Sequence, residues 1–147
     1  MKHSTFTKLM LFTMLIVNVA CHKEIPEEEK AKEIALKFCD AFYNLDIQKA
    51  KEYCVEEMEP VMNFRRHNLR ASDYEARKAA GKAKARVIDM TYLPDNERAY
   101  FDVEISNFLK IDYMNNTTSI LPADTVKIYL KKAYHGNWIV YLESNNK

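Results

Sequence analysis

The sequence predicts an α+β fold in which N-terminal helices pack on one face of an antiparallel sheet. Two observations predict it. Up to about residue 80, apolar residues recur at intervals of three and four, as on a helix face, whereas from about Lys84 they alternate with polar residues, as in half-buried strands. Helices that come first and strands that come afterwards are typical of a helical layer on an antiparallel sheet.

The first 20 residues are typical of a secretory signal peptide. Lys2 and Lys8 give a positive start, and the apolar stretch 9–20 is too short for a membrane span, which needs about 20 apolar residues. Its end, Val19-Ala20-Cys21, resembles a bacterial lipobox, in which a peptidase cuts before the cysteine and the cysteine is diacylated through sulfur. It departs from that pattern at Asn18, where leucine is usual. An ordinary signal peptide cleaved nearby is the alternative.

Lipidation of Cys21 would anchor the chain to a membrane, because several acyl chains, at about 0.8 kcal/mol per buried methylene, hold a protein far more firmly than one chain. We therefore expect a lipid anchor in the inner or outer membrane of a bacterial cell envelope. Residues 21–27 are polar and interrupted by proline, as in a tether, and residues 28–147 form a single domain. Export from the cytoplasm argues against a nucleic-acid partner.

The first helix of this domain is predicted to begin near Glu28. Asp46 is a good N-cap for a second helix, which is predicted to continue to about Pro60. Ser72 to Glu75 resembles a capping box that opens a third helix, and Gly81 is placed to end it. The apolar faces of the first two helices comprise Ala31, Ile34, Ala35, Phe38, Ala41, Phe42 and Leu45, and then Ile47, Ala50, Tyr53, Cys54, Met58 and Val61.

Strands are predicted in ARVIDMTYL, ERAYFDVEIS, DTVKIYLKK and NWIVYLE. Turns at Pro94-Asp95-Asn96 and His135-Gly136-Asn137 join the first two and the last two of these segments. The segment 108–122 is longer than a hairpin loop needs. It forms either an extra strand pair or a loop over an open end of the fold.

Two stretches, AFYNLDIQKAKEYCVEE and DTVKIYLKKAYHGNWIVYL, carry a family resemblance. Together they resemble the nuclear transport factor two-like cone, and more narrowly the small Bacteroidetes lipoproteins that carry a domain of unknown function with this fold. The resemblance covers residues 28–143. It implies a curved sheet wrapped around the long first helix, a conical cavity, and no single activity. Open sheets of this fold often dimerise face to face, which makes a homodimer one expectation.

Isomerase-like members of this superfamily need a tyrosine in the first helix and a carboxylate just after the second helix. By spacing from Asp46, these positions fall on Phe38 and near Met62, and neither side chain can do that chemistry. We therefore expect no enzyme. The rival hypothesis is a cone-fold enzyme, of isomerase, cyclase or hydrolase type, that uses an unrecognised acid or base such as Asp102, Asp124 or Tyr92.

No cofactor or metal is expected. Only two glycines occur, so no glycine-rich phosphate cradle or dinucleotide fingerprint can be built. In the domain, His67 and His135 lack the spacing of metal ligands. Cys39 and Cys54 lie on successive helices of an exported protein. They form either a disulfide or two small buried hydrophobes.

The aromatic residues are either core or the lining of a ligand pocket. A non-enzymatic module that binds a small apolar ligand or another envelope protein is the leading hypothesis. An inhibitor or immunity-type partner of an exported protein is a further alternative, and it would show an exposed apolar patch in segment 108–122. The pocket candidates are Phe38, Phe42, Tyr53, Tyr92, Phe101 and Trp138.

Overall fold

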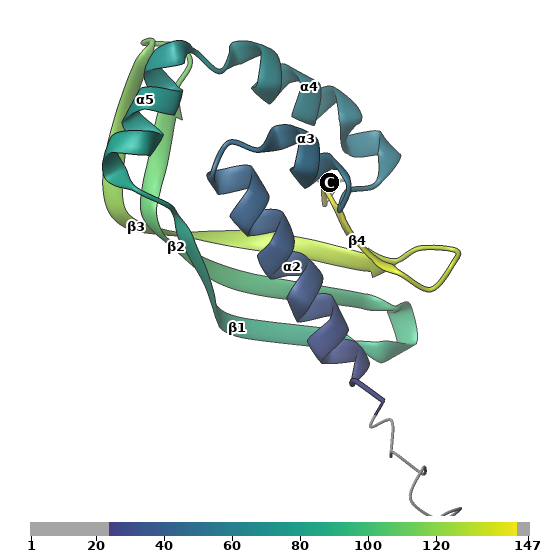
Figure 1. Ribbon diagram of the computed structural model, residues 1–147. Coiled ribbons are helices and arrows are strands. Elements are labelled where there is room, and N and C mark those ends of the chain that lie inside the picture. The colour runs from purple at the N-terminus through teal and green to yellow at the C-terminus, as the bar shows by residue number, and fades with distance from the viewer. Residues whose placement is uncertain (1–23, 144–147) are drawn as a thin grey trace, which may run out of the picture.

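The structure, a computed structural model, describes residues 24–143, and the predicted signal peptide and Cys21 lie outside this range. Over these residues the helices precede the strands, and the helices cover one face of a curved antiparallel sheet that does not close (Figure 1). The predicted α+β fold is therefore confirmed.

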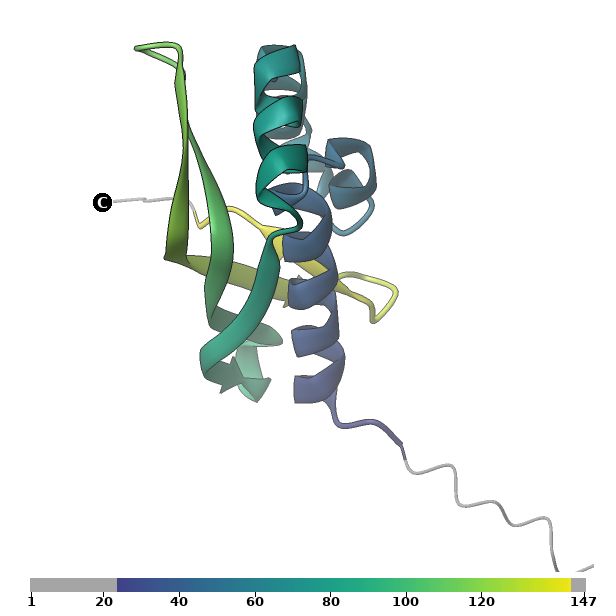
Figure 2. The ribbon, with the colours of Figure 1, turned by 60° about the vertical axis from the view of Figure 1, so that its left-hand side comes forward.

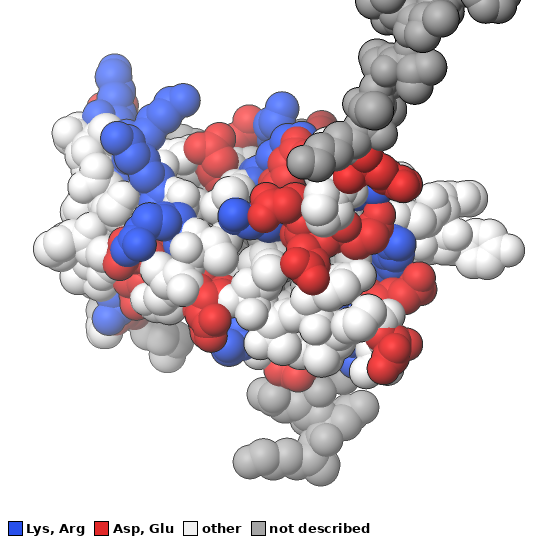
Figure 3. Space-filling view, turned by 90° about the horizontal axis from the view of Figure 1, so that it is seen from below, with Lys and Arg blue, Asp and Glu red and all other residues white. Residues whose placement is uncertain are grey.

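The long helix α2 (Glu27–Tyr43) begins one residue before its predicted start and contacts all four strands of the sheet. Its buried face includes Ala31 and Ala35, both fully buried, and these small side chains let the helix lie close to the sheet. Its first turn is acidic, which complements the positive end of the helix dipole, and acidic side chains gather on this end of the molecule (Figure 3).

Glu27 fixes the start of α2 to the sheet. Its carboxylate accepts hydrogen bonds from Lys30 Nζ at 2.7 Å and Trp138 Nε1 at 3.0 Å, and it forms an ion pair with Lys132 at 2.9 Å. Hydrogen bonds from Lys30, Lys132 and Trp138 lower the pKa of Glu27 to about 2. The carboxylate therefore stays ionised through the physiological range and holds β3 and β4 against the helix.

The predicted length of the second helix is wrong. Helix α3 covers only Ile47–Lys51, and Asp46 caps it as predicted by accepting a hydrogen bond from Lys49 N at 3.1 Å. The chain then leaves the helical path because Val55 N donates to Val140 O at 2.9 Å, and Tyr53 O accepts from Val140 N at 2.7 Å. These long-range bonds to the sheet edge replace the helical bonds of the same groups.

Helical structure resumes in the 3₁₀ turn η1 (Glu56–Met58) and helix α4 (Glu59–Asn68). The sequence predicts Pro60 near the end of a helix, but in the structure Pro60 lies in the first turn of α4. A proline is tolerated there because the N–H groups of the first turn have no partner within the helix. Helix α5 (Ala71–Ala80) follows and ends at Gly81, as predicted, with φ of 78°. That value falls in the region that glycine favours.

The capping box of α5 differs from the predicted pair Ser72 and Glu75. Arg70 is the N-cap, and its backbone N–H donates to Asp73 Oδ2 at 2.8 Å. Asp73 is fully buried and also accepts from the Arg70 guanidinium and from the Thr118 hydroxyl. Asp73 therefore joins the start of α5 to strand β3.

The sheet has the order β1-β2-β3-β4 with every neighbour antiparallel. The predicted turns at Pro94–Asn96, which form the 3₁₀ turn η2, and at His135–Asn137 are both present. The alternation in β2 is confirmed, since Ala99, Phe101, Val103 and Ile105 are all fully buried. The strands are β1 (Lys84–Leu93), β2 (Arg98–Asp112), β3 (Thr117–Lys132) and β4 (Trp138–Tyr141).

Segment 108–122 forms the extra strand pair. Phe108–Asp112 pairs with Thr117–Leu121, and we call this two-stranded end of the β2–β3 hairpin the arm. It begins where Asn107 has φ of 53° opposite Pro122, which lacks an N–H. Beyond this point the hairpin stands beside α5 (Figure 2).

Candidate functional site

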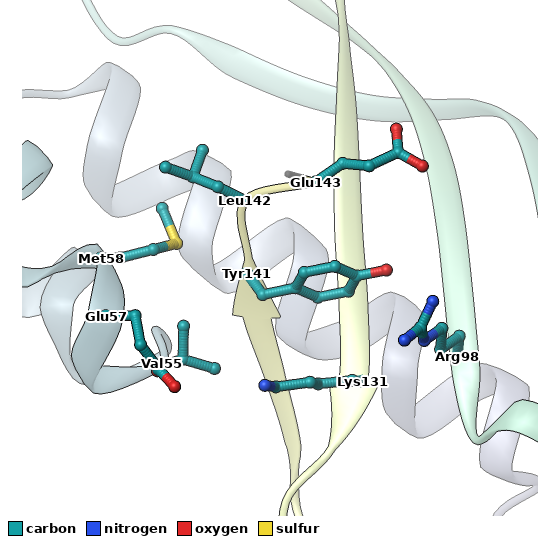
Figure 4. Close-up of a pocket in the computed structure, with 8 residues that line it drawn as sticks. All are labelled: Val55, Glu57, Met58, Arg98, Lys131, Tyr141, Leu142 and Glu143. Carbon is teal, nitrogen blue, oxygen red and sulfur yellow. The ribbon is translucent and has the colours of Figure 1, made fainter. Parts of the chain in front are cut away.

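Two cavities meet where β4 ends. The inner cavity, of about 340 Å³, lies between the helices α2 and α4 and the strands β3 and β4. The outer cavity, of about 390 Å³, lies between η1 and the strands β2, β3 and β4 (Figure 4). Met58, Tyr141, Leu142 and Glu143 line both. The two cavities therefore adjoin along one wall.

The helices supply the apolar lining of the inner cavity. Phe38 and Phe42 lie one turn apart on α2 with ring centroids 5.3 Å apart, and Val61 and Met62 come from α4. Ile128 faces them from β3. These positions follow from the helix period, which places side chains four residues apart on one face. A ligand in the inner cavity would therefore contact apolar side chains from α2, α4 and β3.

The rim of the inner cavity is polar. Lys127 lies there and is paired with Asp102 at 2.7 Å. Glu143, which is exposed, forms a hydrogen bond with Tyr129, and this bond raises the pKa of the phenol. Of these two carboxylates, Glu143 lines the inner cavity and is exposed, whereas Asp102 does not line it.

The outer cavity is lined by residues at η1 on one side and by strand residues on the other. Val55, Glu57 and Met58 lie on the η1 side (Figure 4). Arg98 and Lys131 lie beside Tyr141 on the strands. The Arg98 guanidinium carbon and the Lys131 Nζ are each 5.8 Å from the centroid of the Tyr141 ring. Cations at this distance are attracted by the ring face.

The structure brings only two of the six predicted pocket residues into one cavity. Phe38 and Phe42 line the inner cavity, whereas Phe101 is fully buried in the core. Tyr53 lines a separate hollow with Leu36 on the surface of α2. Tyr92 and Trp138 pack against each other with ring centroids 6.0 Å apart.

Sequence reasoning missed Met62, Arg98, Lys131 and Tyr141 as cavity residues. From the sequence, Met62 is named only as a catalytic position, whereas the alternation in ERAYFDVEIS places Arg98 on the polar face of its strand, opposite Ala99 and Phe101. The signal for Arg98 and Tyr141 was the outward set of the alternating strands, but which outward residues meet depends on strand register. That register is not readable from one strand.

The candidate catalytic positions lie in different environments. Phe38 and Met62 are buried at 4% and 1% exposure. Asp124 is exposed and lines a third cavity of about 320 Å³ with Tyr43 and Arg65. Burial, with a smaller contribution from the thiol of Cys39, raises the pKa of Tyr43. A phenol so shifted stays protonated at neutral pH.

Cys39 and Cys54 are free thiols. Burial raises the pKa of each to about 12, so both stay protonated, and Cys54 Sγ donates to Ala50 O at 3.3 Å. The thiolate is the reactive form, so neither side chain has the character of a nucleophile. Among residues 24–143, no group of three His, Cys, Asp or Glu side chains is arranged to hold a metal ion.

No protein-family model and no curated protein matches the chain. Within the part of the chain that the structure describes, no helix is both long and apolar enough to cross a bilayer.

Proposed function

We propose that the protein is a lipid-anchored module of a bacterial cell envelope, that it is not an enzyme, and that it binds a small apolar ligand in the inner cavity. Cys21 would carry the acyl chains, and residues 21–27 would connect them to the domain. The proposed cone family is compatible with this role because it implies a cavity and no single activity.

The observation that supports the proposal most is the composition of the inner cavity. Phe38, Phe42 and Met62 line it, and its two charged lining residues are Lys127, which is paired with Asp102, and Glu143, which is exposed. Its volume of about 340 Å³ falls at the small end of ligand sites, which run from roughly 300 to 1,000 Å³. The fully buried carboxylate, Asp73, is bonded to Arg70 and Thr118 and faces no tyrosine hydroxyl within hydrogen-bonding distance. An apolar interior of this kind favours binding over acid-base catalysis.

Native mass spectrometry of the protein extracted from its own cells tests this function. The expected spectrum shows a chain that begins at Cys21, carries the mass of acyl chains and retains a small apolar ligand. Val61→Trp should abolish the ligand peak, because Val61 lines the inner cavity and is 42% exposed, so a larger ring can enter the cavity with little disturbance of the core.

Ile88→Trp is the matched control, since Ile88 lies on β1 outside both cavities and is 46% exposed. It should retain the ligand. A wild-type protein without any retained ligand, or a Val61→Trp variant that keeps it, would overturn the binding role. Unchanged processing and membrane retention of Cys21→Ser would overturn the anchor.

A second function is favoured by the arm. Met114 at its tip is 92% exposed and Ile120 is 38% exposed. These apolar side chains form the kind of surface by which an inhibitor or immunity-type protein would contact an exported partner. Photo-crosslinking from position 114 in intact cells tests this function. A single partner, lost in Met114→Lys, supports it, and the absence of any crosslink contradicts it.

A further inference from the structure

Arg98 and Lys131 form a like-charged pair on the outer face of the sheet. They are direct cross-strand neighbours in the β2–β3 register, where like charges destabilise a sheet. Over residues 24–143, neither has a carboxylate oxygen within 4.0 Å of its charged nitrogens. The fold therefore holds two adjacent positive charges without a neutralising partner among the described residues.

Two other cations of the same face are neutralised. Lys127 pairs with Asp102 at 2.7 Å, and Arg86 pairs with Glu104 at 2.9 Å. Arg98 and Lys131, by contrast, lie side by side without an ion pair where the outer cavity opens. A local departure from charge pairing that coincides with a cavity is typical of a binding site.

Two carboxylates, Glu57 and Glu143, also line the outer cavity (Figure 4). In the described part of the chain, residues 24–143, neither forms an ion pair with Arg98 or Lys131 within 4.0 Å. The outer cavity is also lined by the apolar residues Met58 and Leu142, and these two residues line the inner cavity as well. One continuous surface therefore joins a cationic pair to an apolar chamber.

We propose that the outer cavity binds the anionic head group of an amphipathic ligand through Arg98 and Lys131, while the apolar chain of that ligand follows Met58 and Leu142 into the inner cavity. This inference rests on the proposed binding function and specifies its ligand class. A carboxylate or a phosphate group meets the same requirement, because both accept hydrogen bonds from guanidinium and ammonium groups.

The test uses four probes that share one chain length and differ in head group: decanoate, decyl phosphate, decanol and decyltrimethylammonium. Each is titrated calorimetrically into the purified full chain below the micelle concentration of the probe. Wild-type protein should bind the two anions about tenfold more tightly than decanol, and the cation most weakly; a tenfold ratio corresponds to about 1.4 kcal/mol. The preferred anion identifies the head group.

The variant Arg98→Gln/Lys131→Gln should bind decanoate no more tightly than decanol, with decanol affinity unchanged. The variant Lys82→Gln/Arg86→Gln removes the same charge from exposed positions outside both cavities and should keep the preference. Circular dichroism confirms that each variant is folded.

The outcomes separate the two proposals. Equal binding of decanoate and decanol by wild-type protein, or a preference that survives in Arg98→Gln/Lys131→Gln, overturns the head-group site and leaves the apolar cavity standing. Binding of none of the four probes overturns the cavity as a site for acyl chains, and the head-group site with it.

Discussion

Replacing Asp73 by asparagine tests whether a buried carboxylate holds the arm to the helical layer. Its two oxygens have separate partners. Oδ2 accepts from Arg70 N at 2.8 Å and Nε at 3.3 Å, and Oδ1 accepts from Arg70 Nη2 at 3.0 Å and from the Thr118 hydroxyl. On the Oδ2 side, the NH₂ group of an asparagine would face two donors, Arg70 N and Nε, and both bonds would be lost. On the Oδ1 side it would lose the bond from Arg70 Nη2, while the Thr118 hydroxyl could turn and accept.

The expected loss is about 2–4 kcal/mol of unfolding free energy. Each hydrogen bond to a charged group contributes about 1.5–3 kcal/mol; one or two are lost, and the remaining bonds weaken because the side chain is no longer charged. The Arg70 side chain is 34% exposed, so water recovers part of that energy, and this places the result below the simple sum. For a domain of this size, about 4 °C of melting temperature per kcal/mol predicts a fall of about 8–15 °C.

Urea unfolding followed by circular dichroism at pH 7 measures this loss, with Asp95→Asn as the control because Asp95 is exposed in the turn between β1 and β2. The control should stay within about 0.5 kcal/mol of wild type. Thr118→Val should lose less than Asp73→Asn, and the two losses should not add, because both remove one shared bond. A loss below 1 kcal/mol for Asp73→Asn, or full additivity, would refute this account of the arm.

Four further predictions follow from single contacts. In Glu27→Gln, the fluorescence emission of Trp138, the sole tryptophan, should shift because Trp138 loses its carboxylate partner. The difference in unfolding free energy from wild type should be constant above about pH 5 and shrink toward pH 2. The reason is that the folded state favours the ionised form of Glu27, which lowers its pKa. In denaturant melts, Phe101→Ala should lose about 3–5 kcal/mol, since Phe101 is fully buried. Gly81→Ala should lose about 1–3 kcal/mol in the same assay, because φ of 78° with ψ of −173° suits glycine alone. The Cys54 thiol, with its raised pKa, should react with a maleimide far more slowly at pH 7 than in urea, as mass spectrometry would show.

The sequence predicts those parts of the fold whose determinants are local. The period-2 pattern of Ala99, Phe101, Val103 and Ile105 identifies the core face of β2 because each strand residue alternates sides. The cap at Asp46 and the end at Gly81 are likewise decided within a few residues.

The remaining features depend on contacts distant in sequence. The break after α3 arises because Tyr53 and Val55 bond to Val140, more than 80 residues away. The pairing of Arg98 with Lys131 depends on the register of a long hairpin. The aromatic residues were recognised as cavity candidates by type, but burial direction decides among them, so Phe38 faces a cavity and Phe101 does not.

The proposed anchor and the proposed ligand constrain each other through the geometry of α2. Phe38 and Phe42 lie 11 and 15 residues after Glu27, which places them about 17–22 Å along the helix axis from its start. The tether joins the domain at that start, so the inner cavity lies toward the far end of the helix from the anchor. If Cys21 carries the proposed anchor, a ligand held at Phe42 would have left the hydrocarbon of that membrane. Single-chain amphiphiles leave a bilayer far more readily than lipids with several chains, because each methylene transferred to water costs about 0.8 kcal/mol. The position of the cavity thus favours a small, single-chain ligand with a charged head.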